Sequence, residues 1–164
     1  MREKITVFLL LGIFLCGCSS ATESDLTATA SQYVGLQERQ DRREIQELIG
    51  VDPVRTEWCA AFVNAILEIE GIPNLHDIDY PYPLTARGFL KWGLPVAKRD
   101  IKPGDLVIFP RGTQGWQGHV GFYVETTANG YWLILGGNQD KSVKYSLYRP
   151  SRAIAVRRWV PEAT

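Results

Sequence analysis

The sequence predicts an α+β domain, in which helices from the first half of the chain pack on an antiparallel sheet of about five strands from the second half. Two observations lead to this prediction. Apolar residues recur with helical spacing in the first half, whereas short apolar segments separated by turn residues follow residue 102. A chain of 164 residues is long enough for one domain with a hydrophobic core.

Helices are expected where apolar periodicity is flanked by capping and stop residues. Asp41 and Glu44 form a capping-box pattern, and Gly50 is a typical C-terminal stop. Thr56 is the expected N-cap of the next helix, whose wide apolar face predicts that it is the central buried one. The expected segments are two short helices between Tyr33 and Gly50, the central helix up to Ile69, and a shorter helix from about Leu84 to Trp92.

Strands are expected after the turn at Pro103 and Gly104, because each later apolar segment is bounded by turn residues. Short connections of this kind favour antiparallel neighbours. The expected strands are residues 106–109, 118–126, 131–135, 142–148 and 152–159.

The beginning of the chain, MREKITVFLLLGIFLCGC, is typical of a secretory leader. A charged start precedes an apolar run from Ile5 to Leu15 that is short for a membrane span. The segment that ends at Cys18 resembles the bacterial lipobox, which implies cleavage before Cys18 and acylation of its thiol. Ser19 and Ser20, with no Asp, resemble an outer-membrane sorting pattern. We therefore expect a lipid anchor at Cys18 and a location on the periplasmic face of the outer membrane.

Composition divides the chain into three segments. Residues 1–17 are the predicted signal peptide, and the small polar residues of 18–30 predict a flexible tether before a domain over 31–164.

The charge balance limits the partners of the chain. Lys and Arg together number 18, as do Asp and Glu, so the chain has no net charge that would attract nucleic acid. We expect no nucleic-acid partner, and no protein partner is predicted.

Cysteine usage singles out Cys59. Cleavage of the leader removes Cys16, and acylation consumes the thiol of Cys18, so Cys59 has no intramolecular disulfide partner. A lone thiol in an oxidising compartment is either a small buried hydrophobic residue or a reactive group. Both interpretations are open on this evidence.

A nucleophilic role for Cys59 has a physical basis in its place near the start of a helix. Unsatisfied N–H groups there favour the thiolate, and the backbone N–H of Cys59 itself is placed to donate to an oxyanion. His119, between Gly118 and Gly121, is a better candidate base than His76 and would protonate a leaving amine. The alternative for His119 is a half-buried strand histidine bonded to the backbone.

A catalytic imidazole needs a partner that orients it. Asn138, in LILGGNQD, is the preferred candidate, because its amide oxygen could accept from the His119 ring. The alternative is a turn asparagine, and Asp140, Gln139 and Asp105 are weaker candidates for the same role. One usable thiol and two distant histidines lack the ligand spacing of a structural zinc site, so no metal is expected.

The segments WCAAFVNAIL, ARGFLKWG, KPGDLVIF, GHVGFYVE and LGGNQ, in this order, resemble the CHAP and NlpC-type cell-wall amidohydrolases. The resemblance implies a papain-like fold over 31–164, a nucleophile at Cys59, a base at His119 and a polar third member at Asn138. It also implies a peptidoglycan or muropeptide substrate and no cofactor.

The sequence departs from this family in HDIDYPYPLT, where related chains are usually rich in Gly and Ser. Trp58, Tyr82 and Trp116 are therefore candidates for a narrower substrate groove, although Tyr82 also suits a rigid surface loop. The leading hypothesis is a hydrolase that cuts a stem-peptide amide through a thioester. A non-catalytic peptidoglycan-binding lipoprotein and an acyltransferase on the same scaffold are the alternatives.

Overall fold

The computed structural model describes residues 25–161. The predicted signal peptide over 1–17 and the predicted acylation site Cys18 lie outside the described residues. Within 25–161, the helices are too short or too polar to cross a lipid bilayer.

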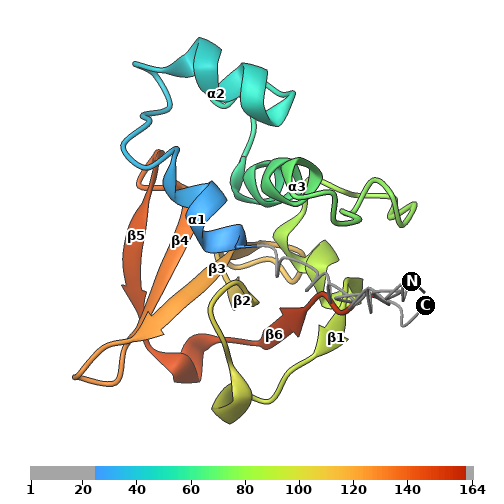
Figure 1. Cartoon of the computed structure of the whole chain (residues 1–164). Coiled ribbons are helices and arrows are strands. Elements are labelled where there is room, and N and C mark those ends of the chain that lie inside the picture. Colours follow the sequence, from blue (N-terminus) through green and yellow to red (C-terminus); the bar gives the residue numbers. More distant parts are fainter. Residues whose placement is uncertain (1–24, 162–164) are drawn as a thin grey trace, which may run out of the picture.

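Six antiparallel strands form one sheet in the order β1-β6-β2-β3-β4-β5 (Figure 1). All five predicted strands are confirmed. The sixth, β1, is only two residues long and exposed, so its sequence lacks the apolar alternation that reveals a strand. The strands are β1 (Leu94–Pro95), β2 (Leu106–Pro110), β3 (Gly118–Thr126), β4 (Trp132–Gln139), β5 (Ser142–Tyr148) and β6 (Ala155–Arg158).

The helices of the first half of the chain precede the long strands and pack on one face of the sheet (Figure 1), which confirms the α+β class, whereas two short 3₁₀ segments lie in connections between strands. Gly50 and Gly93 end their helices with φ of 73° and 57°, the left-handed backbone that glycine adopts without strain. The helices are α1 (Leu26–Ser31), α2 (Arg42–Ile49), α3 (Cys59–Ile69) and three 3₁₀ segments, η1 (Ala86–Lys91), η2 (Lys98–Asp100) and η3 (Pro150–Arg152).

The predicted tether is wrong at its C-terminal end, because residues 26–31 form α1. Asp25 caps this helix by accepting from the Ala28 N–H at 3.0 Å. Leu26 and Ala30 are buried in the main core. Two buried residues four apart are too weak a periodic signal to separate from a polar linker, but their burial makes α1 part of the folded domain.

The central helix begins two residues later than predicted. Trp58, not Thr56, is its N-cap, so Cys59 is the first helical residue. The preceding residues are non-helical because Trp58 is fully buried and its indole N–H donates to Glu38 at 3.3 Å. This tertiary contact outweighs the local capping preference of Thr56.

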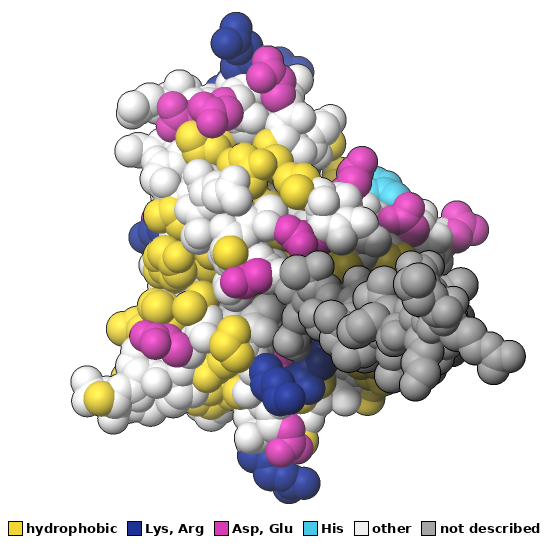
Figure 2. All heavy atoms as spheres, in the orientation of Figure 1, with side chains coloured by type: hydrophobic (Ala, Val, Ile, Leu, Met, Phe, Trp, Pro, Cys, Tyr) yellow, Lys and Arg dark blue, Asp and Glu magenta, His cyan; other side chains and the backbone are white. Residues whose placement is uncertain are grey.

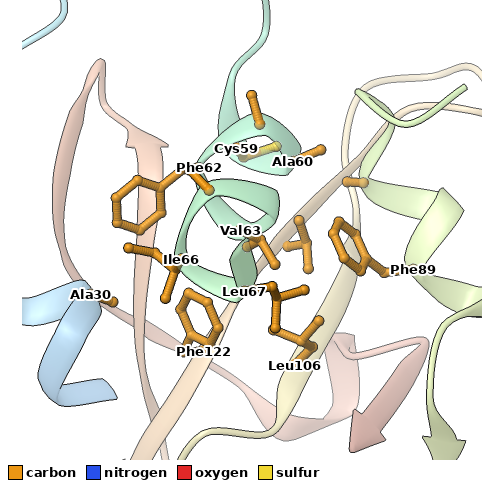
Figure 3. Close-up of a cluster of buried hydrophobic side chains, with 14 of the residues drawn as sticks. Ala30, Cys59, Ala60, Phe62, Val63, Ile66, Leu67, Phe89, Leu106 and Phe122 are labelled. Carbon is orange, nitrogen blue, oxygen red and sulfur yellow. The ribbon is translucent and has the colours of Figure 1, made fainter. Parts of the chain in front are cut away.

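Helix α3 lies at the centre of the main core (Figure 3). Its residues from Cys59 to Leu67 are all buried, as expected for a helix that is apolar on most sides. Phe122 and Leu106 of the sheet face it, together with Phe89 from η1. A smaller cluster around Phe109 and Tyr123 covers the other side of the sheet.

Charges are mixed over the exterior. On the face shown in Figure 2, acidic and basic side chains are both present, and some of them lie side by side. This mixing agrees with the equal numbers of acidic and basic residues in the whole sequence.

Gly137 allows the first turn of α3 to approach β4 closely. A Cβ at this position would lie 2.6 Å from the Trp58 ring and 2.7 Å from the Phe62 Cβ, which is closer than real Cβ atoms come. The absence of a side chain at Gly137 therefore sets the distance between the start of α3 and the sheet.

We expect Gly137→Ala to lower the free energy of unfolding by about 1–3 kcal/mol, because the added methyl overpacks this contact. Gly136→Ala is the matched control, since a Cβ there meets its nearest atom at an ordinary 3.4 Å. Urea denaturation of both variants measures the difference. Equal stability of the two variants would show that the close approach does not constrain the fold.

Candidate active site

Cys59 opens α3 beside strand β3. The backbone N–H groups of Val120 and Ala60 lie close enough to its sulfur to lower the thiol pKa, and the residue is only 3% exposed. Because Val120 directly follows His119, this contact brings the thiol next to the backbone of the candidate base. Cys59 is the free cysteine of the described part of the chain.

Burial dominates the electrostatics of the thiol and raises the pKa of Cys59 above its ordinary value. The N–H groups of Val120 and Ala60 and the charge of Arg111 lower this pKa, but they do not offset the burial. This environment therefore favours the neutral thiol over the thiolate expected from the helix start. The sequence signal at the helix start was sound, but it carried no information about the depth of burial.

His119 is also buried, at 4% exposed, and burial lowers its pKa to about 4, with the charge of Arg111 acting in the same direction and Gln139 opposing it. Its ring stacks on Tyr148 with centroids 5.9 Å apart. Among the described residues, neither ring nitrogen has a hydrogen-bond partner. A buried, unpaired imidazole is costly for a purely structural histidine.

The predicted hydrogen bond between His119 and Asn138 is not formed. Asn138 instead donates its amide N–H to Glu57 at 2.7 Å. The cause is a β-bulge: the β4–β5 register shifts by one residue between Gly136 and Gln139, and Asn138 has φ of 55°. Without the bulge, strand alternation would place Asn138 on the face of the sheet that carries His119.

The bulge brings Gln139 to the side of His119. Gln139 is buried, and the amide favours the protonated form of the ring. The Tyr148 hydroxyl donates to its Oε1 at 3.0 Å, and its Nε2 donates to the Ile134 carbonyl at 3.2 Å. Gln139, a weaker candidate from the sequence, is thus the polar side chain best placed to orient His119. The shift cannot be read from alternation alone.

The other acidic candidates lie elsewhere. Asp105 is buried and forms a bidentate ion pair with Arg158 at 2.6 and 2.7 Å, in the turn after Gly104. Asp140 is exposed and pairs with Lys144. Within residues 25–161 no cluster of three or more His, Cys, Asp or Glu side chains is arranged to hold a metal ion.

Two hollows flank the candidate dyad. One of about 290 Å³ is lined by Cys59, Thr85, Trp116 and Gly118 among others, and we call it the Cys59 hollow. The other, of about 340 Å³, is lined by His119, Asn138, Asp140 and Tyr148 among others, and we call it the His119 hollow. Arg111 lines both.

The three predicted groove residues have different positions. Trp58 is fully buried, so its assignment to a groove is wrong. Trp116 lines the Cys59 hollow and is 65% exposed. Tyr82, 67% exposed, lies in a neighbouring groove of about 550 Å³ that also includes Trp116. An apolar residue such as Trp58 suits both a core and a groove, so its residue type alone could not predict its burial.

Arg111 and Glu57 are site residues that the sequence analysis missed. Their side chains pair at 3.7 Å between the two hollows. Arg111 begins the loop between β2 and β3, which Gln117 organises by accepting the N–H groups of Thr113 and Gln114 at 2.9 and 3.0 Å. In the sequence, Glu57 is a charged residue just before the cysteine and Arg111 is a charged residue at a strand end. Nothing in the sequence indicates that these two residues pair.

Comparison with known proteins identifies one family and several similar folds. The CHAP domain profile matches residues 51–138. No curated protein matches the sequence. An NlpC/P60 family protein from Bacillus cereus ATCC 10987 superposes with a TM-score of 0.54 at 18% identity, covering 84% of this chain and 40% of that one.

Two further structures have the same fold. An NLP/P60 family protein from Staphylococcus aureus subsp. aureus Mu50, described as similar to lipoprotein, gives a TM-score of 0.57 at 16% identity, with 84% and 41% of the two chains covered. The wild-type endolysin LysIME-EF1 gives 0.50 at 17% identity, with 85% and 66% covered. The chain spans about two fifths of the length of both NlpC/P60 proteins.

The lowered pKa of His119 predicts a pH-dependent stability. Between the ordinary value of 6.5 and about 4, the unfolded chain binds a proton that the folded chain rejects, so folding stability falls as pH decreases through this window. The loss assigned to His119 is about 3 kcal/mol. Urea denaturation at about pH 7 and about pH 4 should show this loss in the wild type and a smaller one in His119→Gln.

The control for this measurement is His76→Gln, because His76 is exposed on the loop before Asp77. This variant should keep the wild-type pH dependence. The same loss in His119→Gln as in the wild type would contradict the assignment of a neutral, buried imidazole.

Proposed function

The chain belongs to the CHAP domain family, and on that basis we propose that it is a peptidoglycan hydrolase that cleaves an amide or peptide bond of the stem peptide. Cys59 is the nucleophile and His119 the general base. The observation that carries this proposal is the contact of the Cys59 sulfur with the Val120 N–H, next to a buried His119 whose ring nitrogens have no partner in the described structure.

The attack starts from two neutral groups. Because the pKa of His119 is lowered to about 4, its imidazole is neutral at neutral pH and has a ring nitrogen available to accept the thiol proton. The raised pKa of Cys59 opposes this transfer in the empty site, so the proton moves as the sulfur attacks the bound substrate. The sulfur then forms a bond to the substrate carbonyl carbon, and the carbonyl oxygen becomes an oxyanion. Formation of charge at this step is favoured by substrate groups and N–H donors in the hollow rather than by bulk water.

The oxyanion is stabilised by the backbone N–H of Cys59, which as the first helical residue has no acceptor within α3. His119 returns its proton to the leaving amine as the carbon–nitrogen bond breaks, and a thioester remains on Cys59. His119 then deprotonates a water, whose oxygen attacks the thioester carbon. As the carbon–sulfur bond breaks, His119 gives this proton to the sulfur, which restores the Cys59 thiol and releases the acid product.

The location follows from the sequence of the leader. We propose that Cys18 is acylated and holds the domain at the periplasmic face of the outer membrane, where peptidoglycan or muropeptides are within its reach. Several acyl chains give a stable anchor, at about 0.8 kcal/mol per buried methylene.

Cys59→Ala should abolish hydrolysis, because no other described residue supplies a thiol at this position. Purified wild type and variant are incubated with sacculi and with soluble muropeptides, and products are followed by mass spectrometry. The bond cut is read from the product masses. Equal products from both proteins would refute the cysteine mechanism, and binding to sacculi without products would favour the peptidoglycan-binding alternative. Transfer to an added amine in place of hydrolysis would favour the acyltransferase.

Cys18→Ser should remove the anchor, because serine offers no thiol for acylation. Cells expressing each protein are labelled with palmitate and fractionated, and label is expected in the wild-type protein alone. Cys16→Ser is the matched control and should retain label. Label that persists in Cys18→Ser would contradict lipidation at this residue.

A further inference from the structure

Arg111 and Glu57 form an accessible ion pair at the boundary between the two hollows. The Arg111 Nη1 lies 3.7 Å from the Glu57 Oε2, and the two side chains are 46% and 80% exposed. Such an exposed pair contributes little to stability, since solvent screens it and holding it costs side-chain entropy. Arg111 lines both hollows and Glu57 lines the Cys59 hollow, so a ligand in the Cys59 hollow can contact both charges.

Hydrogen bonds within the protein position Glu57 and the loop that carries Arg111. The Asn138 amide donates to Glu57 at 2.7 Å from the strained end of β4, where φ is 55°. The loop that carries Arg111 is tied to η1 by the Arg87 Nε, which donates to the Gln117 carbonyl at 2.7 Å. Strained residues of this kind tend to occur at functional sites.

The field of Arg111 reaches the reactive groups directly. Arg111 lines both the Cys59 hollow and the His119 hollow, and its charge lowers the pKa of both residues, so a substrate bound between these residues lies within reach of the guanidinium. A lone substrate anion would meet repulsion from Glu57. A group with a carboxylate and an ammonium on one carbon would satisfy both side chains at once.

We propose that Arg111 and Glu57 bind a zwitterionic amino-acid end group of the substrate, with the substrate carboxylate on Arg111 and the substrate ammonium on Glu57. This proposal rests on the proposed function for its choice of substrate. It makes the pair a specificity-determining site of the hydrolase, which selects stem peptides whose third residue ends in such a group.

The test measures binding to the Cys59→Ala protein by calorimetry, so that hydrolysis does not affect the result. The probes are stem peptides that differ only at the third residue. One carries meso-diaminopimelate, which has both charges, and one carries lysine, which has the ammonium alone. A third carries diaminopimelate acetylated on its free amine, which has the carboxylate alone. We expect the first peptide to bind about tenfold more tightly than either other peptide, as one lost charged hydrogen bond implies.

Two further substitutions assign the charges. Arg111→Gln should remove the preference for diaminopimelate over lysine, and Glu57→Gln should remove the preference over the acetylated peptide. Arg99→Gln is the control, since Arg99 is 86% exposed and pairs with Asp100 away from both hollows. Circular dichroism confirms that each protein is folded.

The outcomes separate this proposal from the proposed function. Equal affinity for the three peptides, or preferences that survive both substitutions, would overturn the zwitterion site, whatever the wild type hydrolyses. The expected preferences together with no hydrolysis by the wild type would support the site and refute the hydrolase.

Discussion

The contact between the first turn of α3 and strand β4 at Gly137 is the constraint on which the rest of the structure depends. Trp58 and Phe62 both lie where a Cβ at Gly137 would be. This approach buries Trp58, delays the start of the helix to Cys59 and brings the sulfur to the backbone of Val120. Core packing and the position of the candidate nucleophile are therefore the same feature of the fold.

Burial also decides the charge state of the site. A helix start favours a thiolate, yet loss of hydration outweighs it for Cys59 and equally disfavours an imidazolium at His119. The resting site is a neutral pair with one cation, Arg111, near both groups. In the proposed mechanism, a bound substrate would therefore have to supply the polar contacts that stabilise charge on these two groups.

Most of the fold and part of the candidate site could be predicted from the sequence. Turn residues and apolar periodicity located five strands, α2, α3 and the stops at Gly50 and Gly93, because these signals are local. Three features could not be predicted from the sequence. They are the bulge that places Gln139 instead of Asn138 beside His119, the burial of Trp58, and the ion pair of Glu57 with Arg111. Each depends on contacts between residues far apart in the chain, which propensity and spacing do not encode.

The early start of the folded domain at Asp25 limits the geometry of an anchored protein. Only residues 19–24 separate Cys18 from the cap of α1. Even a fully extended chain of this length spans only about 25 Å, at about 3.3–3.6 Å per residue. If Cys18 is acylated as proposed, the described domain lies within this distance of the membrane surface, and its substrate has to be reached there.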